Sequence, residues 1–184
     1  MIRGPDVSSV QGIVPWDKVA ALPDVGFAVA KCTQGNDGRD PLFARIQENF
    51  ARQAFMATLG ATLTRVAPGE VEIAVPSRHA LTQQHGFLHA GVTASIADSA
   101  CGYAALSVMP EGRDVLSVEF KVNLLAPAAG TGAVARAQVI RAGRTITVCR
   151  ATVFAVDVDG AEKPVLEMQG TMMSVPLPEG RQPG

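Results

Sequence analysis

Residues 91–106 constrain the fold more than any other stretch of this chain, because small side chains recur through them at helical spacing. The segment is dense in Ala, Ser and Cys and carries one acidic residue, Asp98. The small residues spaced three or four apart are Ala90, Ala94, Ala97, Cys101 and Ala104. Such spacing predicts a helix. Its small side chains allow it to lie very close to a sheet, so we expect a central helix packed directly on β-structure.

Alternation of apolar and polar residues predicts strands on both sides of this helix. Pro68-Gly69 and residues 142–144 mark the turns of two hairpins, and Pro127 follows a long, half-buried strand. The predicted strands are 61–67, 70–76, 116–124, 132–141, 145–157 and 164–175.

A second helix, amphipathic and ended by Gly60, is predicted at 45–59 from the spacing of Ile46 and Phe50. The order of elements is therefore helix, two strands, helix and four strands. Strands in runs favour the α+β class, here an antiparallel layer with one central helix. At 184 residues, the chain holds one domain or one domain with an appendage.

Charge and composition exclude several classes of function. Sixteen Lys and Arg against seventeen Asp and Glu give a net charge of −1, which excludes a generally basic nucleic-acid-binding protein. No apolar run reaches the ~18 residues that span a bilayer, and the N-terminus lacks a signal-peptide pattern. We therefore expect a cytoplasmic protein without a membrane partner. His79, His85 and His89 have no Cys or acid cluster beside them, so we expect no metal site.

The start of the central helix carries the chemistry. A polar loop runs from Gln83 straight into Ala90 and Gly91, whose amides lie at the positive end of the helix dipole. Such amides are ready donors to a developing oxyanion. Asp98, in an otherwise apolar helix, is a candidate general base or nucleophile.

The spacing between these two groups matters. Ala90 and Asp98 are eight residues apart, or roughly 12 Å along a helix. One substrate carbonyl cannot touch both on the same helix. Either they serve different purposes, or Asp98 completes a site whose amides come from a second subunit, which predicts an obligate dimer.

The same residues carry a family resemblance. The pattern Gln83-x-x-Gly86-x-x-His89-Ala90-Gly91, with Asp98 nine residues after His89, resembles the hotdog-fold acyl-CoA thioesterases. The phenylacetyl-CoA thioesterase type is the most similar, over about residues 45–175. The resemblance implies an antiparallel sheet wrapped around a long central helix. It also implies hydrolysis of acyl-CoA thioesters, here expected to carry aryl or medium-chain acyl groups, in a homodimer or homotetramer.

The family also implies roles for individual residues, without a metal or other cofactor. The Ala90 amide binds the thioester oxygen, and Asp98 comes from the partner subunit. Gln83, where the family has Asn, and His89 position the reacting groups, and Ser117 assists. The residues implied to contact the substrate and its CoA portion are Gly91, Gly143, Arg144 and Thr145. The chain departs from the family in having His-Ala-Gly for His-Gly-Gly.

The first 45 residues resemble something else, the start of a glycoside hydrolase family 25 lysozyme, with Asp6 at that family's first acid. This resemblance implies a truncated β/α-barrel-like leader. No Asp-x-Glu occurs in the chain, so we expect no muramidase activity. The expected division is a leader at 1–45, a thioesterase domain at 46–176 and a tail at 177–184.

Several alternatives stay open. Asp98 also fits a buried acid that pairs with a neighbour, His89 a residue that fixes the helix start, and Ser117 an ordinary strand residue. Arg144 belongs to a basic group that fits either a solvated face or the attraction of CoA phosphates. The alternative functions are a non-catalytic acyl-CoA-binding module, an enoyl-thioester hydratase and, from the leader, a cell-wall hydrolase.

Overall fold

The structure is a computed structural model that describes residues 40–177 of the 184. The helices are α2 (Pro41–Ala51), α3 (Ala54–Leu59) and α4 (Ala90–Ser107), with a 3-10 turn, η2 (His79–Leu81). The strands are β1 (Thr62–Ala67), β2 (Glu70–Pro76), β3 (Arg113–Leu124), β4 (Gly132–Ala142), β5 (Ile146–Val156) and β6 (Glu162–Pro176). The segment expected to be a lysozyme-like leader lies outside the described residues up to residue 39, Asp6 included, as does the expected tail from 178 onward.

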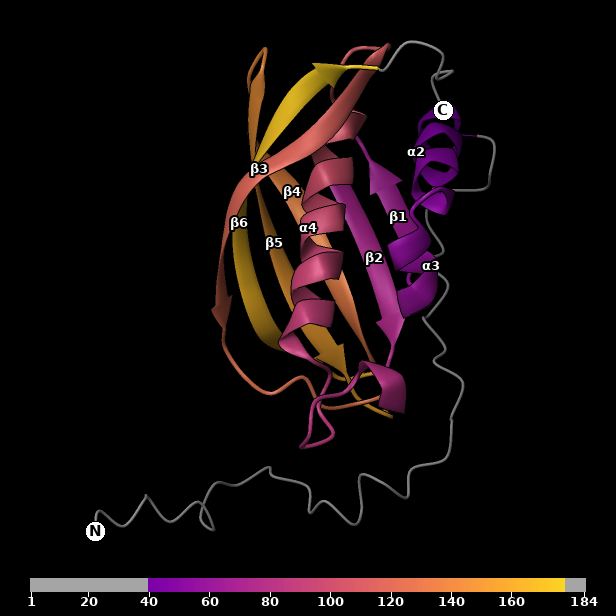
Figure 1. The fold of residues 1–184 in the computed structure, drawn as a ribbon, viewed down its shortest axis with the longest axis vertical. Helices are drawn as coiled ribbons and strands as arrows, with labels where there is room; N and C mark the ends of the chain where they lie inside the picture. The colour runs from indigo at the N-terminus through magenta and orange to yellow at the C-terminus, as the bar shows by residue number, and fades with distance from the viewer. Residues whose placement is uncertain (1–39, 178–184) are drawn as a thin grey trace, which may run out of the picture.

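All six strands form one antiparallel sheet in the order β1-β2-β4-β5-β6-β3. The sheet curves around α4, which lies along its inner face (Figure 1). This arrangement confirms the expected α+β class with a long central helix. The six predicted strands are confirmed to within three residues at each end.

Small residues on both surfaces explain why α4 lies against the sheet. Ala97, Ala100 and Cys101 of α4 are fully buried, and so are Ala135 of β4 and Ala151 of β5. With methyl groups on both sides, the helix and the strand backbones approach closely.

The helix predicted at 45–59 is wrong in one respect, because it is two helices. Gln53 is extended (φ −78°, ψ 95°) and separates α2 from α3. Its side-chain Nε2 donates a 2.9 Å hydrogen bond to the Tyr103 hydroxyl on α4, which anchors the junction. At the other end, the Asp40 carboxylate caps α2 and Pro41 occupies its first turn, so the helix begins before Arg45. It therefore crosses the expected boundary between residues 45 and 46.

The strand predicted as half-buried, β3, is exposed on both faces over residues 116–121 in the single chain. Within residues 40–177 it is an edge strand, and its one pairing partner there is β6. Its apolar side chains at Leu116, Val118 and Phe120 are 56%, 53% and 46% exposed. The alternation of apolar and polar residues predicts that one face of the strand is apolar. It does not predict whether the same chain covers that face. Unpaired apolar edge strands are ready surfaces for pairing with another chain.

No helix within residues 40–177 has both the length and the apolar character needed to cross a membrane.

Candidate active site

His89 shapes the N-terminus of α4. It is the N-cap residue, with extended backbone (φ −61°, ψ 140°), and its ring Nδ1 accepts a 2.9 Å hydrogen bond from the Gly91 amide. A neutral imidazole that accepts at Nδ1 carries its proton on Nε2. The backbone amide of His89 donates to the Leu81 carbonyl at 2.9 Å, which ties the helix start to η2. The role of His89 in fixing the helix start is therefore visible in the structure.

The two amides proposed from the sequence differ in their surroundings. The Gly91 amide is engaged by His89, and a side chain at Gly91 would bring its Cβ to 3.0 Å from the ring Nδ1. The Ala90 amide has no hydrogen-bond partner among the described residues. It is therefore the donor at this helix start that is left for a ligand.

Gln83 lies in the loop that leads to this helix start. Its backbone amide donates to the Phe87 carbonyl at 2.9 Å, and its carbonyl accepts from the Gly86 amide at 2.9 Å. Its side-chain Oε1 accepts from the His85 amide. Gly86 has φ 82°, a conformation that glycine adopts at little cost. The Gln83 oxygen therefore braces the loop in this structure.

Asp98 lies at the middle of α4 and faces β3. The Ser117 hydroxyl donates a 2.7 Å hydrogen bond to Asp98 Oδ1, and Ser117 Oγ also lies 3.4 Å from the sulfur of Met172. None of the ion pairs between described residues involves Asp98. The carboxylate is thus held by a neutral donor, which leaves its charge available for chemistry.

A small cavity of about 110 Å³ opens beside this pair. It is lined by Asn49, Gln53, Asp98, Ser99, Gly102, Tyr103, Asp114, Val115 and Ser117. Burial raises the pKa of Tyr103 to about 12, so its phenol is neutral at physiological pH. The sequence analysis missed Asn49, Gln53 and Tyr103. The one available signal was that Tyr103 is the only tyrosine of the chain.

The predicted site residues do not meet in one subunit. Ala90 and Asp98 are separated by eight residues of one continuous helix, or roughly 12 Å. The turn at Gly143–Thr145 lies two strands from β3. The Ser174 amide on β6 donates a 2.8 Å hydrogen bond to the Thr145 carbonyl, and Ser174 pairs with Val115 of β3. Two strand spacings are roughly 10 Å. The turn is therefore at the end of the sheet where β3 begins, far from the start of α4 (Figure 1).

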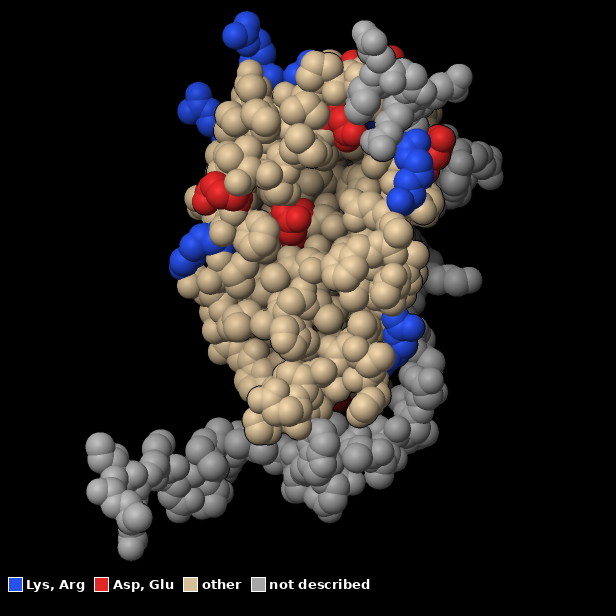
Figure 2. Space-filling view, in the orientation of Figure 1, with Lys and Arg blue, Asp and Glu red and all other residues tan. Residues whose placement is uncertain are grey.

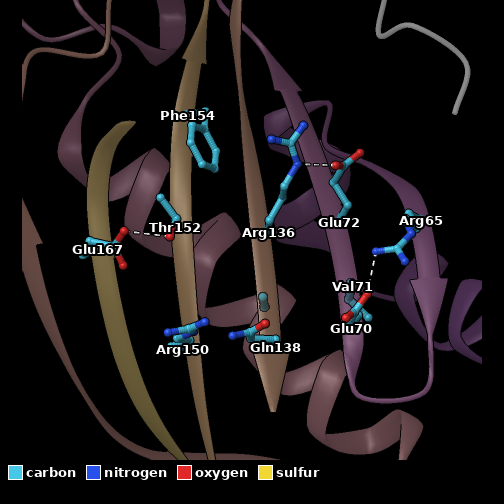
Figure 3. A pocket seen from close by; sticks show the side chains of 11 residues that line it. Arg65, Glu70, Val71, Glu72, Arg136, Gln138, Arg150, Thr152, Phe154 and Glu167 are labelled. Atoms are coloured by element: carbon cyan, nitrogen blue, oxygen red, sulfur yellow. Dashed lines mark hydrogen bonds and ion pairs between the residues drawn. The ribbon is translucent and has the colours of Figure 1, made fainter. Parts of the chain in front are cut away.

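A larger hollow, of about 450 Å³, lies on the face of the sheet turned away from α4 (Figure 3). Arg136 lines it and forms ion pairs with Glu72 at 2.7 Å and Glu162 at 2.6 Å. Its guanidinium also lies 5.0 Å from the ring centre of Phe154. The charge of Arg136 is therefore paired with carboxylates, and the hollow holds no residue of the predicted site.

The described residues contain no group of three His, Cys, Asp or Glu side chains placed to hold a metal ion.

Comparison with known proteins points to one family. The thioesterase superfamily profile matches residues 85–161. A thioesterase family protein from Silicibacter pomeroyi has a similar structure, with 49% identity and a TM-score of 0.72 over 74% of this chain and 99% of that one. The PaaI protein of the Escherichia coli phenylacetic acid degradation operon shares the fold at 20% identity, with a TM-score of 0.64 over 73% and 93% of the two chains. A Haemophilus influenzae thioesterase does so at 23% identity, with a TM-score of 0.63 over 73% and 91%.

Proposed function

Because the chain belongs to the thioesterase superfamily and has its hotdog fold, we propose that it hydrolyses acyl-CoA thioesters to the free acid and CoA. The observation that carries the proposal is Asp98, a carboxylate held by the Ser117 hydroxyl at the edge of a cavity and without an ion-pair partner among the described residues. Carboxylates in such positions serve as general bases or nucleophiles.

In the proposed reaction, Asp98 acts in one of two ways. As a base, it takes a proton from water while the water oxygen bonds to the thioester carbon. As a nucleophile, its own oxygen bonds to that carbon, and water hydrolyses the resulting anhydride. In both cases, the carbon–sulfur bond breaks, and the CoA thiolate leaves and takes up a proton. Ser117 orients the carboxylate in either route.

The Ala90 amide is the proposed oxyanion donor. It lies at the first position of an 18-residue helix, where the helix dipole favours negative charge. Removing one such donor typically lowers kcat by ~10²–10³. His89 holds this helix start in shape, and Gln83 braces the loop before it. In the proposed site, Gly91 lets the substrate approach closely, and Gly143, Arg144 and Thr145 contact the CoA portion.

A dimer is part of the proposal, because Ala90 and Asp98 of one α4 lie too far apart to act on one carbonyl. The edge strand β3 carries Ser117 and exposes Leu116, Val118 and Phe120. On the side of the molecule where α4 lies, charged side chains are sparse (Figure 2). Two copies joined along this surface bring Asp98 of one subunit toward Ala90 of the other. A dimer of two such pairs is the larger assembly that we propose.

The test is release of free thiol from a panel of acyl-CoA thioesters by the full chain. The Asp98→Asn variant removes the base and the nucleophile while keeping the shape, and we expect kcat to fall by at least ~100-fold. Asp159→Asn, at an exposed turn, is the matched control and should retain wild-type turnover. A folded protein that binds acyl-CoA without releasing thiol would overturn the proposal in favour of a binding module. Hydration of an enoyl-CoA would overturn it in favour of a hydratase.

A further inference from the structure

The cavity beside Asp98 is small and is lined largely by polar side chains. We propose that it receives the acyl group and selects short acyl chains that carry a neutral hydroxyl or oxo group. This inference rests on the proposed function, since it places the acyl group next to the carboxylate that acts on its carbonyl. It replaces the aryl or medium-chain expectation drawn from the sequence with short acyl chains.

The volume of the cavity limits the acyl group. At about 110 Å³ it is smaller than a cavity of ~150 Å³ that holds one benzene molecule. It therefore admits only a few non-hydrogen atoms. A longer alkyl chain has to extend beyond the cavity, and the carbon atoms outside it gain nothing from burial against its wall.

A chain of hydrogen bonds forms the polar wall. Ser99 Oγ donates to Gln53 Oε1 at 3.3 Å, and Gln53 Nε2 donates to the Tyr103 hydroxyl at 2.9 Å. The Tyr103 hydroxyl in turn donates to Asn49 Oδ1 at 3.3 Å. Tyr103 is only 2% exposed, and the Phe50 ring packs against it edge-on at 5.8 Å. The wall is therefore a fixed feature of the fold.

Two side-chain nitrogens in this wall have N–H groups that can donate hydrogen bonds to a ligand. The Asn49 side-chain nitrogen has no hydrogen-bond partner among the described residues, and Gln53 Nε2 uses one of its two N–H groups. A hydroxyl or oxo oxygen on the acyl chain accepts from these groups. An alkyl group in the same place covers them without a partner, which carries a desolvation cost.

The negative charges that line the cavity disfavour an acyl chain that carries a carboxylate. Asp98 and Asp114 both line the cavity, and no Lys or Arg is among its lining residues. An acyl chain that ends in a carboxylate would place a third negative charge there, which is unfavourable. The selected group is therefore neutral.

Substitution of Gly102 provides an independent test of the cavity's size. It lies on α4 in the cavity wall, and the nearest atom that an added Cβ would meet is Val115 Cγ1, at 3.9 Å. This is ordinary contact, and alanine is a better helix former than glycine. Gly102→Ala therefore reduces the cavity without straining the fold.

The experiment measures kcat/KM of the full chain for acetyl-CoA, butyryl-CoA, 3-hydroxybutyryl-CoA, acetoacetyl-CoA, succinyl-CoA and octanoyl-CoA. We expect the hydroxy and oxo substrates to exceed butyryl-CoA by about tenfold, the scale of one net hydrogen bond. Succinyl-CoA and octanoyl-CoA should be poorer than butyryl-CoA. Gly102→Ala should lower the ratio of butyryl-CoA to acetyl-CoA turnover.

Two variants test the wall directly. Tyr103→Phe and Gln53→Met keep the shape of the side chains but break the hydrogen-bond chain, and each should lower the hydroxybutyryl-to-butyryl ratio by about tenfold. Gln169→Met, on an exposed position of β6, should leave the ratio at the wild-type value.

The outcomes separate the two proposals. If no thioester is turned over, the proposed function fails, and this inference fails with it. If thioesters are hydrolysed but butyryl-CoA equals 3-hydroxybutyryl-CoA in the wild-type protein, the inference is overturned while the function stands. The wild-type panel alone decides this, so a variant that fails to fold leaves the test intact.

Discussion

The hydroxyl of Ser117 donates a 2.7 Å hydrogen bond to Oδ1 of Asp98, and so joins the edge strand β3 to the middle of α4. The two residues are nineteen positions apart in the chain, separated by the second half of the helix and the turn that follows. The bond fixes one oxygen of the carboxylate and places the pair at the rim of a cavity.

Removing the serine hydroxyl should slow the reaction without unfolding the protein. In Ser117→Ala, the carboxylate loses a hydrogen bond to a charged group, typically ~1.5–3 kcal/mol, or about 10–100-fold in kcat if the bond orients Asp98 for reaction. Ser117 is exposed in the single chain, so the melting temperature should change little. Steady-state kinetics and thermal melts check this, with exposed Thr58→Ala as the control. Wild-type kcat in Ser117→Ala would show that the serine is an ordinary strand residue.

Replacing Ala90 by proline should remove the proposed oxyanion donor while leaving the helix intact. Ala90 is the first residue of α4, where proline is well tolerated, and His89 before it already has the extended backbone that proline requires. We expect kcat to fall by ~10²–10³ with little change in helix content. Circular dichroism and thiol-release kinetics measure the two effects. Activity at the wild-type level would rule out the Ala90 amide as the donor.

Mixing two inactive variants should restore activity if each site takes residues from both subunits. A heterodimer of Asp98→Asn and Ala90→Pro contains one intact site, formed by the Ala90 amide of the first variant and Asp98 of the second. After subunit exchange, about a quarter of wild-type activity is expected from the symmetry of a two-fold dimer. Light scattering establishes the assembly, and each variant alone is the control. No recovery after demonstrated exchange would place both groups in one subunit and contradict the shared site.

The two buried cysteines of the described residues should resist thiol reagents. Burial raises the pKa of Cys149 to about 12 and raises the pKa of Cys101 as well. Because the thiolate is the reactive form, both remain protonated and unreactive at pH 8, and reactivity increases only as the pH approaches these raised values. Mass spectrometry after alkylation, with and without denaturant, identifies which cysteines react. Rapid labelling of Cys101 in the folded protein would contradict the packing of α4 against the sheet.

Much of the fold was predictable because its signals are local. Apolar alternation located six strands, and the small-residue stripe located α4 and its face against the sheet. Gly60 ends α3 with φ 68°, as its place at the end of a helical pattern predicted. The motif before α4 also indicated a helix start, and the structure makes His89 its cap. Each of these features depends on residues within a few positions of one another.

Other features depend on contacts between segments that are far apart in the sequence. The break at Gln53 follows from a hydrogen bond to Tyr103, fifty residues away, which no periodicity along 45–59 reports. The exposure of Val118 follows from the place of β3 at the edge of the sheet. Local patterns therefore determined the elements and the candidate acid, Asp98. Only the tertiary structure decided what surrounds that acid, because the cavity is built by α2, α4 and β3, whose proximity is fixed by packing rather than by neighbouring residues.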